Sequence, residues 1–136
     1  MPSIRSTIRY FATLASSSTS ILTTSSSPTV VVFSLFPGIQ QNVVRHFLDV
    51  PDLRGIVLRS YGSGNAPQKP WLIQLLKEAT MRGVTIVNIS QCVAGSVKMG
   101  RYEASFHLKE AGVVSGYDST VESAVTKLMF LQAKYK

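Results

Sequence analysis

Glycines, histidines and one cysteine are the residues of this chain whose types and spacing invite a chemical interpretation. Gly62 and Gly64 begin a G-x-G pattern, but Pro67 stands where the third glycine of a dinucleotide-binding fingerprint belongs, and no P-loop lysine-serine pair follows. His46 and His107 lie far apart in the sequence, without the paired cysteines or the H-E-x-x-H motif of a metal site. We therefore expect neither a nucleotide cofactor nor a bound metal.

The cysteine, Cys92, is the only one in the sequence. No base stands close to it in the chain, and there is no G-x-S-x-G elbow, so the sequence contains no self-contained nucleophile. A single cysteine cannot form an internal disulfide, which argues against a disulfide-stapled secreted domain and fits a reducing compartment. At the end of an apolar run, Cys92 is expected to be a small buried residue.

Length and composition limit the possible classes of protein. The chain has 136 residues, which suits one domain with a single core, and 45% of them are hydrophobic and 15% charged, as in a soluble globular protein. No apolar run approaches the roughly 20 residues that cross a bilayer, so no membrane partner is expected. The net charge of +7 comes from scattered lysines and arginines rather than a basic run, so we expect no nucleic-acid partner.

The first 28 residues differ from the rest of the chain. They contain two arginines and no acidic residue, and ten of the twelve positions from Ser16 to Ser27 are serine or threonine. A helix over residues 3–14 would be amphipathic, as in an organelle transit peptide, and would direct the protein to the mitochondrion. The alternative is a disordered leader without an address, in which case a cytoplasmic location is expected.

From Thr29 onward, apolar runs alternate with segments of helical periodicity. The runs predict strands over residues 29–37, 54–62, 84–90 and 113–117, and the periodic segments predict helices over 40–50, 70–82, 101–112 and 119–134. Pro70 suits the first turn of its helix, and Gly83 stands where a C-terminal cap belongs. Ser119 and Glu122 have capping-box spacing at the start of the final helix.

The alternating order predicts an α/β fold, a small doubly wound domain of the Rossmann-like or flavodoxin-like type. Right-handed crossovers would give a three-layer domain with about four parallel strands and helices on both faces of the sheet. The loops that follow the carboxyl ends of the strands would then lie on one edge. Arg59, Asn65, Cys92 and Asp118 stand in or beside these loops, so a site, if the domain has one, is expected there.

Three motifs, in this order and spacing, resemble one known family. The segments GIVLRSYGSGNAP, GVTIVNISQCVAGSVKMGRY and AGVVSGYDSTVESAVTKLMFL are similar to the C-terminal domain of the type I, cytoplasmic-type L-asparaginases, a family that also includes one subunit of the archaeal glutamyl-tRNA amidotransferases. The resemblance covers residues 29–136. It implies an amidohydrolase that converts asparagine and water to aspartate and ammonia.

The resemblance also implies that the catalytic threonines lie elsewhere. In the family they occur in T-G-G-T-I and H-G-T-D-T segments, and this sequence contains neither segment. A hydroxyl needs an adjacent base and an oxyanion site to attack an amide, so we expect no catalytic residue here and no activity from the chain alone. A non-enzymatic amino-acid-binding or subunit-interaction module is the alternative function.

Further roles follow from the resemblance for individual residues. Asn65 corresponds to the asparagine of the G-x-G-N turn, which lies near the substrate of a neighbouring subunit; the alternative is that it only satisfies the geometry of the turn. Arg59 and Cys92 correspond to an effector site for a second amino acid, in which Asp118 would hold the ammonium group. Glu122 could also hold it, but both acids have an alternative as helix-start charges favoured by the dipole, and this alternative explains Glu122 better.

These roles also define the partners that we expect. The ligands would be asparagine or aspartate, bound weakly if at all, because the rest of each pocket would come from another domain. The protein partner would be a catalytic asparaginase domain or another copy of the chain in a homo-oligomer.

Overall fold

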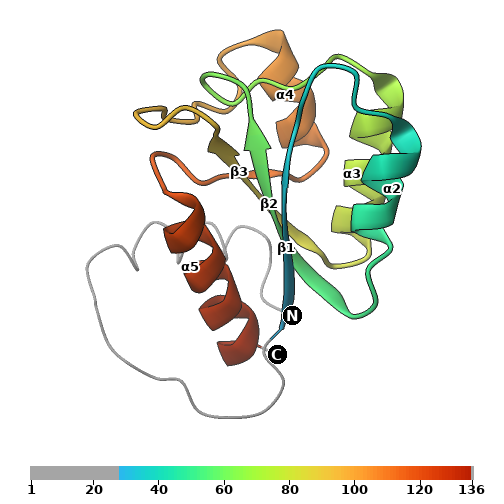
Figure 1. Cartoon of the computed structure of the whole chain (residues 1–136), viewed down its shortest axis with the longest axis vertical. Helices are drawn as coiled ribbons and strands as arrows, with labels where there is room; N and C mark the ends of the chain where they lie inside the picture. The colour runs from blue at the N-terminus through green and yellow to red at the C-terminus, as the bar shows by residue number, and fades with distance from the viewer. Residues whose placement is uncertain (1–27, 136) are drawn as a thin grey trace.

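The computed structural model describes residues 28–135, and Figure 1 shows their arrangement. The leader expected over residues 1–28 lies, except for its last residue, outside the described part. The strands are β1 (Thr29–Ser34), β2 (Leu53–Ser60), β3 (Thr85–Ser90) and β4 (Val114–Ser115). The helices are α2 (Gln41–Leu48), α3 (Pro70–Met81), α4 (Glu103–Glu110) and α5 (Val121–Lys134).

The four strands form one parallel sheet in the order β1-β2-β3-β4. Val32 pairs with Val57, Val57 with Val87, and Val87 with Val114, so one row of valines crosses the sheet. The expected fold class, a three-layer α/β domain with four parallel strands, is therefore confirmed. The strand order follows the chain order, so the sheet contains no reversal of strand order.

The helices cover the two faces of the sheet unequally (Figure 1). A large cluster of buried residues from α2, α3, α4 and their flanking segments packs on one face, including Val44, Leu76 and Leu108. A smaller cluster on the other face contains Val57 and Val87 and is completed by residues of α5. A right-handed crossover to each next strand places all three connecting helices on one face, which leaves the opposite face to the final helix.

The ends of α3 agree with the sequence prediction, and the start of α5 differs from it. Pro70 is in the first turn of α3, and Gly83 follows its end with a φ of +93°. At α5, however, the capping box expected from Ser119 and Glu122 is wrong. The N-cap is Thr120, whose hydroxyl oxygen accepts a hydrogen bond from the Ser123 N–H at 3.2 Å.

The helices within residues 28–135 are either too short or too polar to span a bilayer.

The apolar face of α3 predicted from its periodicity is buried as expected, at Leu72, Leu75, Leu76 and Ala79.

Candidate functional site

Four loops lie at the carboxyl edge of the sheet, at the end toward which the arrow of β2 points in Figure 1. They follow the strands in turn and cover residues 35–40, 61–69, 91–102 and 116–120. Parallel strands bring such loops to a common edge, and the last three are joined by hydrogen bonds. The Lys98 N–H donates to the Ser63 carbonyl, and the Val97 N–H donates to the Tyr117 carbonyl, both at 3.0 Å.

The loop after β2 begins with a tight turn. The Tyr61 N–H donates to the Asn65 carbonyl at 2.9 Å, and the Asn65 N–H donates to the Tyr61 carbonyl at 2.8 Å. Positive φ angles occur at Gly62, +49°, and at Gly64, +109°. The glycines therefore provide the backbone conformations that an ordinary residue avoids.

The geometry of this turn gives no reason for an asparagine at position 65. Asn65 is not among the residues with a positive φ, so the left-handed conformation that asparagine tolerates is not used there. Its Oδ1 atom is buried and accepts no hydrogen bond within the described chain. The side chain therefore retains an acceptor that the local structure does not use.

Arg59 lies at the end of β2 and on the face of the sheet that α5 covers. Side chains alternate along a strand, so Arg59 shares its face with Val57, which packs in the α5 cluster. Its Nη1 atom donates to the Ser34 hydroxyl on β1 at 3.2 Å, while its Nε atom is buried and makes no hydrogen bond to the described residues. The hydrogen bond at Nη1 thus fixes one edge of the guanidinium, whereas the Nε donor is not held by the described residues.

Asp118 lies at the carboxyl ends of the strands, on the face of the sheet that α5 covers, as does Arg59. A Cβ added to Gly55, near the start of β2, would meet Leu128 at 2.6 Å, and Gln132 donates to the Arg54 carbonyl at 3.3 Å. Helix α5 therefore runs opposite to the strands and begins at their carboxyl ends. Asp118, which is exposed, stands in the loop just before it.

The expectation that Cys92 is buried is wrong. The thiol is exposed, because β3 ends two residues earlier and the chain turns outward. The Ser90 hydroxyl stabilises this turn by accepting from the Cys92 N–H at 3.0 Å and donating to the Gly62 carbonyl at 2.6 Å. The loop that carries Cys92 is thereby tied to the loop that carries Asn65.

Three polar side chains at the ends of β2 and β3 were missed by the sequence analysis. Ser60 and Asn88 are fully buried and hydrogen-bonded to each other. The Gln91 Nε2 group donates to the carbonyls of Leu35 at 2.6 Å and Arg59 at 2.8 Å. In the sequence these three residues stand inside or directly after apolar runs. Such runs predict strands, but they do not show which groups the polar side chains bond to.

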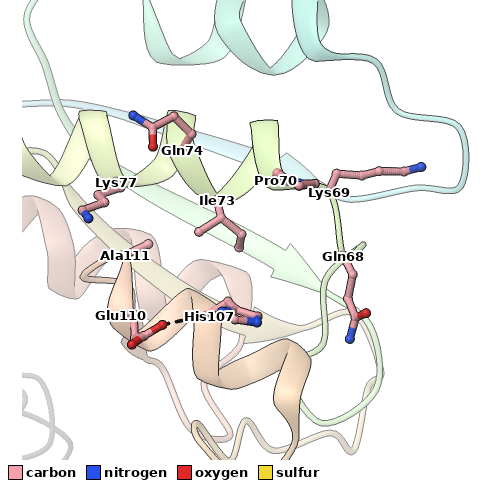
Figure 2. A pocket seen from close by; sticks show the side chains of 9 residues that line it. All are labelled: Gln68, Lys69, Pro70, Ile73, Gln74, Lys77, His107, Glu110 and Ala111. Atoms are coloured by element: carbon pink, nitrogen blue, oxygen red, sulfur yellow. Dashed lines mark ion pairs between the residues drawn. The ribbon is translucent and has the colours of Figure 1, made fainter.

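Two hollows on the described surface lie away from these residues. One is a groove of about 620 Å³ between α3 and α4, with Gln68, Ile73 and the ion-paired His107 and Glu110 in its wall, and Figure 2 shows its lining. Its two lysines extend toward different ends of the groove and do not converge. The other hollow, of about 550 Å³, lies beside α2. None of Arg59, Asn65, Cys92 and Asp118 lines either hollow.

No group of three or more histidine, cysteine, aspartate or glutamate side chains within the described residues is arranged to hold a metal ion. The four predicted site residues, which stand in or beside the loops of the carboxyl edge, supply an amide, a guanidinium, a carboxylate and a thiol. These group types are chemically suited to the carboxylate and ammonium groups of an amino acid, and no hydrogen bond pairs a nucleophile with a base among them.

Comparison with known proteins identifies relatives over most of the described domain. The sequence model of the Glutaminase/Asparaginase C-terminal domain matches residues 29–136. L-asparaginase 1 of Escherichia coli K12 is 48% identical over 100 residues, which cover 74% of this chain and 29% of that protein. The 60 kDa lysophospholipase of Homo sapiens is 45% identical over 102 residues, 75% of this chain and 18% of that protein.

The crystal structure of L-asparaginase I from Vibrio cholerae has the same fold in the matched part. The two superpose with a TM-score of 0.74 at 44% identity, over 79% of this chain and 32% of that chain. The present chain thus spans less than a third of the length of each of these relatives.

Proposed function

Because the chain belongs to the glutaminase/asparaginase C-terminal domain family, we propose that it serves as the C-terminal domain of an amide-hydrolysing assembly of the asparaginase type. In this proposal the assembly converts asparagine and water to aspartate and ammonia. The nucleophile and its base come from a catalytic domain or from another chain, because the carboxyl edge pairs no nucleophile with a base. The present domain contributes binding groups.

Asn65 is proposed to contact the substrate bound by the partner. The observation that supports this role is the unused Oδ1 atom of Asn65, in a turn whose special backbone angles are all at glycines. A side-chain amide can accept a hydrogen bond from a substrate ammonium group and donate one to a carboxylate. The alternative role, as a residue required by the turn, lacks this support.

Arg59, Cys92 and Asp118 are proposed to form one side of a second amino-acid site. The guanidinium of Arg59 is suited to an amino-acid carboxylate, which it can bind through two parallel hydrogen bonds. The carboxylate of Asp118 would hold the ammonium group. Two observations support this pairing: a hydrogen bond fixes one edge of the Arg59 guanidinium, and Arg59 and Asp118 lie at the same end of the face that α5 covers. Half of the pocket would again come from the partner.

The similarity to an asparaginase favours this function over a non-enzymatic module. The human relative is named for a different hydrolysis, so the choice of asparagine as substrate is part of the proposal and needs a direct test. That test must supply the missing catalytic groups.

A chimaera with a known asparaginase provides the missing catalytic groups. Residues 29–136 of this chain would replace the matching segment of the Escherichia coli L-asparaginase 1, and ammonia release from L-asparagine would be measured. We expect an active chimaera, and we expect Asn65→Ala to lower kcat/KM by about tenfold or more, as for a lost hydrogen bond to a charged group. Gln68→Ala, an exposed change in the same loop, is the control.

The chain alone is expected to release no ammonia. The proposal is contradicted if the Asn65→Ala chimaera is as active as its parent, or if the purified chain hydrolyses asparagine and a change within it abolishes the activity.

A further inference from the structure

We infer that Asn88 is a positioning residue, which holds the turn that presents Asn65 to the partner's substrate. The inference rests on the proposed function only for the role of Asn65, whereas the contacts of Asn88 stand independently. Asn88 lies on β3, one of the two inner strands of the sheet, near the edge where the loops meet, and is fully buried. A buried amide must find partners for its donors and its acceptor, so its contacts indicate what it holds.

Both ends of the Asn88 amide are used. Its Oδ1 atom accepts a hydrogen bond from the Ser60 hydroxyl, which also lies within 3.2 Å of the Ile89 carbonyl. Its Nδ2 group donates to the Gly64 carbonyl at 3.1 Å and approaches the Met99 Sδ atom at 3.5 Å. The acceptor therefore faces the end of β2, and the donor faces the turn beyond it.

The contact with Gly64 acts directly on Asn65. The Gly64 carbonyl and the Asn65 N–H belong to one planar peptide unit. Asn88 holds the oxygen of this unit, and the Tyr61 carbonyl holds its N–H at 2.8 Å. With both edges of this plane fixed, the Cα atom of Asn65 is placed. The Tyr61 N–H holds the next peptide unit by donating to the Asn65 carbonyl at 2.9 Å, so the direction of the Asn65 Cα–Cβ bond is set.

The close packing of the turn leaves little freedom for another arrangement. Gly64 is buried, and a Cβ added to it would lie 2.7 Å from Val97 Cγ1 and 3.3 Å from Asn88 Nδ2. The backbone of the turn thus lies directly on the Asn88 amide. If the amide donor is lost, the Gly64 carbonyl loses its partner in a buried place, where water cannot easily replace it.

The main chain of Asn88 joins a second loop to the same residue. The Gly116 N–H donates to the Asn88 carbonyl at 2.8 Å, at the start of the loop that carries Asp118. A Cβ on Gly116 would come within 2.6 Å of Ile89 and 3.1 Å of the Asn88 oxygen, so this loop also crosses β3 closely. Asn88 therefore holds the proposed substrate residue and the proposed effector loop in register.

Two variants of the full chain separate positioning from general stability. Asn88→Asp keeps the shape and the acceptor for Ser60 but replaces the donor to Gly64 by an oxygen. Ser60→Ala removes the hydroxyl that donates to Asn88 and leaves the Gly64 contact intact. Both lose a buried hydrogen bond, so a purely structural role predicts similar effects on the turn.

Amide hydrogen exchange, followed by NMR, gives the first measurement. In Asn88→Asp we expect the Asn65 and Tyr61 N–H groups to exchange about tenfold faster relative to Ile56 in the centre of β2, whereas Ser60→Ala should leave this ratio unchanged. An unchanged ratio in Asn88→Asp, or an equal change in both variants, overturns the inference.

Titration with L-aspartate gives the second measurement. If the wild-type chain shows shifts at Asn65, Asn88→Asp should weaken them and Ser60→Ala should not; equal binding by the two variants overturns the positioning role. If the wild type shows no shifts, half of each pocket is not enough for binding without the partner, and the exchange ratio decides what Asn88 holds.

A measurement on the wild type covers the case in which Asn88→Asp does not fold. The Asn88 Nδ2 protons should be protected from exchange and show scalar coupling across the hydrogen bond to the Gly64 carbonyl carbon. Rapid exchange of both protons contradicts the inference.

Discussion

The guanidinium of Arg59 donates to the hydroxyl of Ser34 at 3.2 Å, across the face of the sheet that α5 covers. This contact joins the ends of the two paired strands β1 and β2, which are in register at these residues. It also fixes one edge of the guanidinium. An arginine held in this way is preorganised to bind a second group through its remaining donors.

Arg59→Lys is expected to abolish the weak binding of L-aspartate that half of the second amino-acid site allows. A lysine keeps the positive charge but cannot bind both oxygens of a carboxylate through a rigid fork. Chemical-shift titration measures the binding, and Arg54→Lys, an exposed change on the same strand, is the control. Equal affinity in the two variants would exclude Arg59 from the site.

Iodoacetamide is expected to modify Cys92 in the native chain without denaturant, because the thiol is exposed. L-aspartate should slow this reaction if Cys92 lines the proposed effector site. Mass spectrometry follows the modification, and Cys92→Ser should change the free energy of unfolding by no more than about 0.5 kcal/mol. A thiol that reacts only in denaturant would contradict its observed exposure.

Gly64→Ala is expected to destabilise the domain more than Gly62→Ala. Both glycines have a positive φ, but a Cβ at Gly64 would lie 2.7 Å from Val97, whereas one at Gly62 would meet no atom within 4 Å. Overpacking should add about 1–3 kcal/mol to the cost of the backbone conformation. Urea denaturation measures the difference, and equal losses would show that the turn can shift away from Val97.

Gly55→Ala and Leu128→Ala are expected to be coupled in their effects on stability. A Cβ at Gly55 would meet the Leu128 side chain at 2.6 Å, so Gly55→Ala should lower the free energy of unfolding by about 1–3 kcal/mol. Leu128→Ala should cost about 2–5 kcal/mol through the cavity that it leaves. The double variant should lose less than the sum, and strict additivity would contradict the contact.

Thr120→Ala is expected to lower the free energy of unfolding by about 0.5–2 kcal/mol, because the Thr120 hydroxyl caps α5. Ser119→Ala is the control and should change it by no more than about 0.5 kcal/mol. Thermal unfolding of the two variants distinguishes them. A larger loss from Ser119→Ala would support the capping box that the sequence suggested.

The order and class of the elements could be predicted from the sequence, because apolar periodicity reports how each segment is buried. The position of a helix cap was wrong by one residue, since Ser119 and Thr120 offer the same hydroxyl chemistry. The prediction that Cys92 is buried was wrong for a related reason. The apolar run before it marked a strand, but the hydroxyl of Ser90 ends that strand and turns the chain outward.

Asn88 shows what a sequence alone does not reveal. It stands inside the apolar run VTIVNIS, where periodicity indicates burial but gives no partner. Its partners Ser60 and Gly64 lie 28 and 24 residues earlier and are brought to it by the pairing of β2 with β3 and by the turn that follows β2. Such contacts depend on the register of strands and loops, which a local pattern does not contain.

The order of the strands has a consequence for the way the chain folds during synthesis. Each strand pairs with the one made before it, and the helix between them can cover the first face as the chain emerges. The opposite face depends on α5, which is made after all four strands and reaches back to β2 through Gln132, 78 residues from Arg54. Until then the apolar row that includes Val57 and Val87 stays uncovered, and the nascent domain presents a surface suited to chaperones and prone to aggregation.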